Sequence, residues 1–328
     1  MTVLGKSAAA SLCHNWISVS VPRKQDGPRL LAILVVSLGL VAVSMGAILV
    51  RCSQEAPSLA IASYRMVFAT LLLSPVYFVS RRGRSLRGSW TGLHAAAGIA
   101  LAFHFALWIG SLRYTSVAVS VLLVNTSPVF VAAGAHLFLA ERLTRKGLAG
   151  VAAALTGSFL LGFGDLQTLG DWRGAALALA GALALGIYLM IGRRIRQASD
   201  LFGYVYPTYA ISASALVGAT VASGTRLTGF SPWTFLFLLL LGLVPQAIGH
   251  TSYNWALRFL PATSVSTMIV GEPVLASLFA WWLLGERLDV HVIPGALLVM
   301  AGILLVSFGG VTVGDRDRSE SRAARTER

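Results

Sequence analysis

Long apolar runs alternate with short polar segments along almost the whole chain. Because a helix needs about 20 mostly apolar residues to cross a bilayer, these runs predict ten transmembrane helices. We place them at residues 30–50, 58–79, 91–112, 115–139, 147–164, 174–191, 202–222, 233–257, 262–284 and 292–313. The loops between them are short, so we expect no inserted soluble domain.

The two ends of the chain lack this pattern. Residues 1–28 hold only a weak apolar stretch interrupted by Lys6, His14 and Asn15, which is poor both as a cleaved signal peptide and as a span. Residues 314–328 are charged and nearly free of apolar side chains. We predict a cytosolic tail at each end, the second of them disordered.

The chain also contains an internal repeat. The segment LRYTSVAVSVLLVNTSPVFVAAGAHLFLAERL recurs, without a gap and at a constant offset, as LRFLPATSVSTMIVGEPVLASLFAWWLLGERL. Pro128 corresponds to Pro273 in this alignment, and Glu141 corresponds to Glu286. The sequence therefore predicts two related halves, residues 29–164 and 174–313, each with five helices.

An odd number of helices in each half determines how the halves are oriented. A five-helix unit that begins in the cytoplasm ends outside, so the second unit begins outside and the two face opposite ways. We therefore predict an all-α integral membrane protein built from two inverted five-helix repeats, with both termini in the cytoplasm.

The distribution of basic residues agrees with this orientation. Loops predicted to be cytoplasmic include one with Arg81, Arg82, Arg84 and Arg87 and another with Arg193, Arg194 and Arg196. The intervening loops carry one basic residue each, namely Arg51, Arg113, Arg173, Arg226 and Arg287. Because cytoplasmic loops are enriched in Lys and Arg, we predict a multi-pass protein of the cytoplasmic membrane.

Composition excludes several other classes of protein. The chain is 56% hydrophobic and only 12% charged, with a mean hydropathy of +0.74, which is far too apolar for an ordinary soluble domain. A net charge of +13 could indicate a nucleic-acid partner in a soluble protein, but here the basic residues lie at helix ends, so we expect none. No GxxxxGK[ST], HExxH, CxxC or GxSxG motif occurs, so we expect no enzyme activity, cofactor or metal site.

These features resemble the drug/metabolite transporter superfamily, and specifically its EamA-type transporters. The resemblance covers about residues 29–313 and lies in the helices with a central Pro and an acidic end, the Gly-spaced helix after each, and Arg65 in SYRMVFA. It implies ten helices, a central cavity between the repeats, and export or exchange of small organic solutes. It does not identify the substrate.

Glu272 is the acidic residue that lies deepest in a predicted span. A carboxylate at the centre of a bilayer is costly unless it is protonated, paired or hydrated, and such residues often mark proton or cation sites. Pro273 next to it lacks an amide hydrogen, so we expect a helix kink there. The alternative is that Glu272 only bonds a neighbouring helix.

The corresponding part of the first half is also polar. Asn125, Ser127 and Pro128 occupy the same depth, and a second kink at Pro128 could place small polar side chains and freed carbonyls around a substrate. Ordinary hydrogen bonding between helices is the alternative role for these side chains.

Arg65 is predicted to lie close to the depth of Glu272 in the membrane, so that the two side chains could contact one another or a shared substrate. A zwitterionic amino acid would suit an Arg and a Glu separated along one cavity, because each charge would meet its opposite. The alternative is a structural arginine that snorkels to the interface.

Aromatic residues and histidines add weaker candidates. His104 and Trp108 stand in the aromatic segment FHFALW, which fits a binding pocket as well as plain packing. His136 and His250 are placed near the cytoplasmic end, where a binding role is less favoured. The Glu141-Arg142 pair is interpreted as an anchor at the water boundary, with a gate contact as the alternative.

We therefore expect a secondary transporter or facilitator of amino acids, amines or drug-like metabolites, with export favoured by the resemblance. A nucleotide-sugar or sugar-phosphate carrier, a membrane enzyme and a sensor subunit are the alternatives. The expected partners are a small-molecule substrate and the lipid bilayer, and protons and a second copy of the chain in a homodimer are considered as well.

Overall fold

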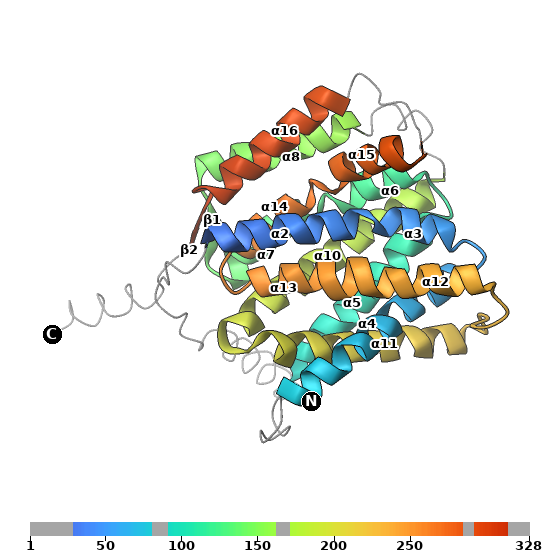
Figure 1. Ribbon diagram of the computed structural model, residues 1–328. Helices are drawn as coiled ribbons and strands as arrows, with labels where there is room; N and C mark the ends of the chain where they lie inside the picture. Colours follow the sequence, from blue (N-terminus) through green and yellow to red (C-terminus); the bar gives the residue numbers. More distant parts are fainter. Residues whose placement is uncertain (1–28, 81–90, 162–170, 285–291, 314–328) are drawn as a thin grey trace, which may run out of the picture.

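The computed structural model describes residues 29–80, 91–161, 171–284 and 292–313, and it is almost entirely helical (Figure 1). The predicted tails at residues 1–28 and 314–328 lie outside the described residues. The first half contains α2 (Arg29–Ser44), α3 (Gly46–Cys52), α4 (Ser58–Ser80), α5 (Gly92–Ser111), α6 (Val117–Val124), α7 (Ser127–Phe138), β1 (Glu141–Leu143) and α8 (Arg145–Leu161). The second half contains α10 (Trp172–Ala198), α11 (Leu201–Ala222), α12 (Pro232–Leu241), the π-helix η1 (Gly242–His250), α13 (Thr251–Ala256), α14 (Ala262–Ile269), α15 (Glu272–Leu284), α16 (Val292–Ser307) and β2 (Val311–Val313).

Within the described ranges, 8 helical segments are long and apolar enough to cross a membrane. They correspond to eight of the ten predicted spans, so that part of the prediction is confirmed and the chain is an integral membrane protein. The other two predicted spans are the shorter helices α8, with 17 residues, and α16, with 16 residues. That these two helices also cross the bilayer stays a prediction, as does the cytoplasmic position of both termini.

The outside of the helical bundle is apolar, and its interior holds many polar groups. Large aliphatic side chains such as Leu38, Leu71 and Leu297 are exposed, as expected for a surface that faces lipid. Buried hydroxyls pair across helices, for example Ser63 of α4 with Thr220 of α11 at 2.8 Å. This arrangement fits a bundle in which hydrogen bonds and close packing, rather than water exclusion alone, hold the helices together.

The all-α prediction needs one correction, because two short strands pair at one end of the bundle. β1 and β2 run antiparallel, with Glu141 opposite Val313 and Leu143 opposite Val311. The pair lies at the end where α2 begins, and α3 and α12 reach the opposite end (Figure 1). Extended backbone near a bilayer must find partners for its N–H and C=O groups, and the pairing of these two strands supplies them.

Two helices are interrupted at equivalent places in the two repeats. α6 ends at Val124 and α7 starts at Ser127, with Pro128 in its first turn. In the second half α14 ends at Ile269 and α15 starts at Glu272, next to Pro273. Each span thus continues through a short irregular turn where the sequence predicts a kink, since a proline suits the first turn of a helical segment better than a helix interior.

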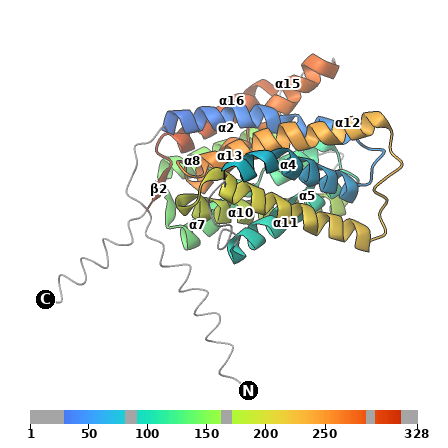
Figure 2. The ribbon, with the colours of Figure 1, turned by 60° about the horizontal axis from the view of Figure 1, so that its bottom comes forward.

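The helices α8 and α16 join the two repeats through glycines (Figures 1 and 2). A Cβ built at Gly157 would lie 2.5 Å from the carbonyl oxygen of Gly295, and one built at Gly150 would lie 2.9 Å from that of Gly302. Gly150 and Gly157 are the repeat equivalents of Gly295 and Gly302, so the two contacts are reciprocal, as a two-fold axis between the repeats requires. Gly309 lies beyond the end of α16 with φ +113.

This close contact predicts a strong effect of adding volume to α16. We expect Gly302→Leu to lower the midpoint of thermal denaturation in detergent, because a Cβ at Gly302 would lie 2.5 Å from the backbone of Gly150 and of Ala154, and overpacking costs about 1–3 kcal/mol or more. Gly218→Leu is the matched control, since nothing lies within 4 Å of a Cβ at that helical position. Equal midpoints of denaturation for the two variants would show that the close contact between α8 and α16 is not needed for stability.

Candidate functional site

A small buried cavity lies where the helix breaks meet α4, α5 and η1. Its volume is about 20 Å³, and its lining comes from both halves of the chain. The lining includes five of the six candidate side chains from the sequence, namely Arg65, His104, Trp108, Asn125 and Glu272. Ser127, the sixth, is buried within α7 but is not part of the described lining.

Arg65 is held inside the bundle rather than snorkelling to the interface. Its side chain is 1% exposed, and its Nε donates a hydrogen bond to Oε1 of Gln246 at 2.9 Å. The guanidinium carbon lies 4.0 Å from the ring centroid of Phe105 and 5.7 Å from that of Trp108. A buried cation fixed by one hydrogen bond and two aromatic faces keeps its remaining N–H groups available for an anion.

Glu272 is the first residue of the half-helix α15 and is 6% exposed. It lines the same cavity as Arg65, so the structure places one anionic and one cationic side chain around a single space. The N-terminus of a helix carries partial positive charge, which favours a carboxylate at that position. The equivalent start of α7 carries Ser127, so the two helix breaks differ in charge at the same depth.

Two histidines face each other across the aromatic side of the cavity. His104 donates from Nδ1 to the carbonyl oxygen of Gly181 at 3.0 Å, and its ring stacks on that of Trp108 with 6.2 Å between centroids. His250 lies 6.3 Å from His104 and 5.3 Å from Phe105, centroid to centroid. The aromatic segment of α5 therefore contributes to the cavity wall.

Several buried polar atoms around the cavity have no hydrogen-bond partner among the described residues. They include both amide atoms of Asn125, Nε1 of Trp108, Nε2 of Gln246, Nδ1 of His250 and the hydroxyl of Tyr253. Leaving a buried polar group unpaired costs about 1–3 kcal/mol. Such a cluster is typical of a site that a hydrated or bound solute completes.

The sequence analysis did not single out Gln246 and Tyr253, and it gave His250 only a less favoured binding role. His250 was placed near the cytoplasmic end, but it lines the cavity, as does Tyr253, and Gln246 holds Arg65. The sequence did contain a signal for this part of the site, because Pro245 stands inside the span next to Gln246. In the structure the segment forms a π-helix. Interruptions of this kind often occur at functional sites. His136 is exposed on α7, away from the cavity.

Comparison with known proteins gives the family of the chain. The model of the EamA-like transporter family matches residues 29–163 and again residues 172–308. The chain belongs to the EamA-like transporter family. It is therefore a membrane-embedded transporter of small molecules, and the family indicates a transport role rather than an enzymatic one.

Individual relatives agree with this assignment. A protein of Salmonella typhimurium called a probable amino-acid metabolite efflux pump is 28% identical over 301 residues, which cover 88% of this chain and 96% of the relative. An uncharacterized transporter of Archaeoglobus fulgidus is 27% identical over 75% of this chain and 86% of its own length. A solved crystal structure matches with a TM-score of 0.72 over 86% of this chain and 98% of its own, and its 16% identity shows the fold alone.

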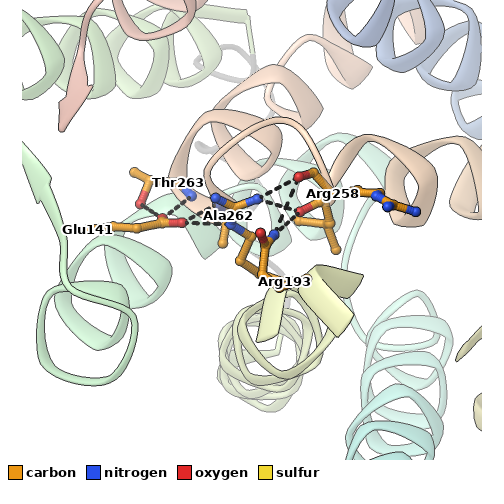
Figure 3. A network of polar contacts seen from close by, with 7 residues as sticks. Glu141, Arg193, Arg258, Ala262 and Thr263 are labelled. Atoms are coloured by element: carbon orange, nitrogen blue, oxygen red, sulfur yellow. Dashed lines mark hydrogen bonds and ion pairs between the residues drawn. The ribbon is translucent and has the colours of Figure 1, made fainter. Parts of the chain in front are cut away.

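A buried ion pair joins the two repeats at the end of the bundle where β1 lies (Figure 3). The carboxylate of Glu141 in β1 accepts a hydrogen bond from Nε of Arg193 at 3.1 Å and one from the backbone N–H of Ala262 at 3.2 Å. Nη1 of Arg193 also donates to the carbonyl oxygens of Leu257 at 2.7 Å and Arg258 at 3.2 Å. The network ties the first half to the start of α14 and the end of α13 in the second half.

The burial of Glu141 overturns its interpretation as an anchor at the water boundary. Glu141 is only 2% exposed. Burial raises the pKa of the Glu141 carboxyl above the ordinary value, and Arg193 and the amide donors of α14 lower it in part. A buried ion pair adds specificity of arrangement more readily than net stability, so this contact fixes how the two repeats meet.

We predict that Arg193→Gln loosens this end of the transporter. Removing one partner of a buried ion pair costs about 3–5 kcal/mol, so the start of α14 should open more often. In a variant without Cys13 and Cys52, a cysteine introduced by Ser264→Cys, buried in the first turn of α14, should react several-fold faster with a polar thiol reagent.

Two controls separate local opening from general unfolding. Arg258→Gln makes the same change of charge, but the side chain of Arg258 points away from the ion pair (Figure 3), and its carbonyl oxygen remains an acceptor. A cysteine introduced by Ser63→Cys is equally buried in α4. If Arg193→Gln accelerates labelling at both reporter positions alike, the network does not act as a local closure.

Proposed function

We propose that this transporter is a secondary transporter or facilitator that exports small amino-acid-like zwitterions across the cytoplasmic membrane by alternating access. The observation that carries the proposal is the presence of Arg65 and Glu272 around one buried cavity. A zwitterion brings a carboxylate for the guanidinium and an ammonium for the carboxylate, so each buried charge gains an opposite partner.

The remaining lining supports the same class of solute. The amide of Asn125 has an unpaired donor and an unpaired acceptor, which can serve either end of a zwitterion. Phe105 and Trp108 offer aromatic faces beside Arg65, where the apolar part of a solute can pack. A nucleotide sugar or sugar phosphate is less favoured, because Arg65 is the sole arginine or lysine of the described cavity lining.

The small volume of the cavity supports alternating access. About 20 Å³ is enough for about one water molecule and too little for an amino acid, so a solute can enter only when helices around the cavity separate. The interrupted helices α6–α7 and α14–α15 are suitable elements for this movement, because each half-helix can tilt without bending a continuous helix. Export is the preferred direction because one relative is called a probable amino-acid metabolite efflux pump.

Counterflow in liposomes tests the proposed transport directly. Purified protein reconstituted in liposomes loaded with unlabelled amino acids should accumulate labelled amino acids from outside, and the same measurement with labelled amines and sugar phosphates gives the substrate class. Empty liposomes are the control. The absence of flux for every solute would favour a sensor subunit, and flux of sugar phosphates alone would favour the carrier alternative.

The role of Arg65 gives a sharper prediction. We expect Arg65→Lys to raise the KM for a zwitterionic solute about tenfold or more, since a charge-assisted hydrogen bond is worth about 1.5–3 kcal/mol and lysine loses the bidentate geometry. The KM for an amine without a carboxylate should change little. Arg226→Gln, at an exposed position outside the cavity, is the control, and an equal loss for amine and zwitterion would remove Arg65 from carboxylate recognition.

The role of Glu272 is tested by its neutral analogue. We predict that Glu272→Gln abolishes the part of transport that depends on a pH gradient, because glutamine cannot bind and release a proton. Counterflow without a gradient should remain measurable, and size-exclusion chromatography should show folded protein. Unchanged dependence on the pH gradient would exclude Glu272 as the proton-coupling group.

A further inference from the structure

A second and much larger pocket opens at the other end of the bundle from the Glu141–Arg193 network. It lies between α3, α4, α5 and α6, has a volume of about 590 Å³, and is open at the surface. Typical small-molecule sites measure roughly 300–1,000 Å³, so this pocket, unlike the central cavity, has room for a metabolite. The charge distribution in the sequence predicts that this end is external.

We infer that this pocket, called here the vestibule, is a second binding site that takes organic carboxylates with a small apolar body. Its position relative to the central cavity is the first support. On three membrane spans the linings of the two spaces include residues four positions apart, which is about 6 Å along a helix. The pairs are Val43 and Ala47, Arg65 and Ile61, and Phe105 and Ile109. A solute in the vestibule is thus about one helical turn from the central cavity.

The charge of the vestibule is the second support. Arg51 at the end of α3 and Arg113 after α5 are exposed and line the pocket, together with Gln54 and Tyr114. No acidic side chain is part of its described lining. A concave surface with charge of one sign concentrates solutes of the opposite sign, so the vestibule favours anions.

Two acidic residues adjoin the lining, Glu55 next to Gln54 in the chain and Asp171 through a backbone hydrogen bond to Tyr114, and their carboxylates are bonded to other groups. Oε2 of Glu55 accepts hydrogen bonds from the N–H of Ser231 at 2.9 Å and from Oγ1 of Thr234 at 2.6 Å, and these bonds lower the pKa of the Glu55 carboxyl. Asp171 follows the same pattern, since its Oδ1 accepts from the N–H of Arg173 at 3.0 Å. Both carboxylates are thus committed to α12 and α10 rather than to the two vestibule arginines.

The apolar part of the lining indicates what accompanies the carboxylate. Val50, Ile109, Leu112 and Val117 line the pocket together with the two arginines. A small aliphatic or aromatic group can pack there while a carboxylate meets the guanidinium groups. The binding of carboxylates in the vestibule does not depend on the proposed function. Only the position of the vestibule on the exit path of the solute rests on that function.

A cysteine in the vestibule can test this inference without transport. In a variant without Cys13 and Cys52, Gln54→Cys supplies a single thiol in the pocket. The probes are two methanethiosulfonate reagents, one carrying a sulfonate and the other a trimethylammonium group. We expect Arg51→Gln with Arg113→Gln to slow the anionic reagent several-fold without slowing the cationic one. We also expect 3-phenylpropionate to protect the thiol, and 3-phenylpropionamide not to.

The control is the double variant Arg173→Gln and Arg226→Gln, which removes the same charge from the same predicted side but outside the vestibule lining. An equal effect of both double variants, protection by the amide, or no protection by the carboxylate would overturn the inference. Labelling uses purified protein without a gradient, so its failure leaves Arg65-dependent counterflow untouched. If counterflow is absent but 3-phenylpropionate still protects the thiol, the result would contradict the proposed function and leave the vestibule inference standing.

Discussion

The structure depends on one constraint, which is that every backbone N–H and C=O group inside a bilayer must be satisfied within the protein. Continuous helices meet this constraint with bonds four residues back, and at the two breaks the bonds shorten to three residues, as from the N–H of Thr126 to the carbonyl of Leu123 and from that of Gly271 to the carbonyl of Met268. Both breaks lie in the interior of the bundle, where Asn125 and Glu272 are buried beside the central cavity. Irregular backbone at this depth is tolerated where it lines such a cavity, so the position of the site follows from the position of the breaks.

The same constraint explains why the duplicated halves differ where they do. Scaffold positions stay alike, since Pro128 and Pro273 start equivalent half-helices and the glycines of α8 and α16 make reciprocal contacts. A solute that is not itself symmetric needs different groups on the two sides of the cavity. The change from Ser127 to Glu272 at equivalent positions supplies one of these differences in charge.

Much of the fold could be predicted from the sequence because helical spans, repeats and loop charges are local or additive signals. Pro128 and Pro273 at equivalent positions of the repeat predicted a kink in each half, and the depth of Glu272 and Arg65 indicated that they could share a space. His250 was given a less favoured role, although it lines the central cavity, because hydropathy does not report the π-helix that contains both Pro245 and His250. The β1–β2 pair was missed because it joins residues far apart in the chain.

The two ends of the bundle carry different charged residues in the described ranges. The Glu141–Arg193 pair joins the repeats at one end, and the repeat offset that maps Glu141 onto Glu286 maps Arg193 onto Ile48, so the same two residue types do not recur in the second copy. An alternating transporter must exchange closure of one end for closure of the other. Closing the vestibule would bring Arg51 and Arg113 together in a narrowing space, which costs energy unless an anion lies between them. A bound carboxylate would lower that cost, so occupancy of the vestibule would bias which end of the transporter is closed.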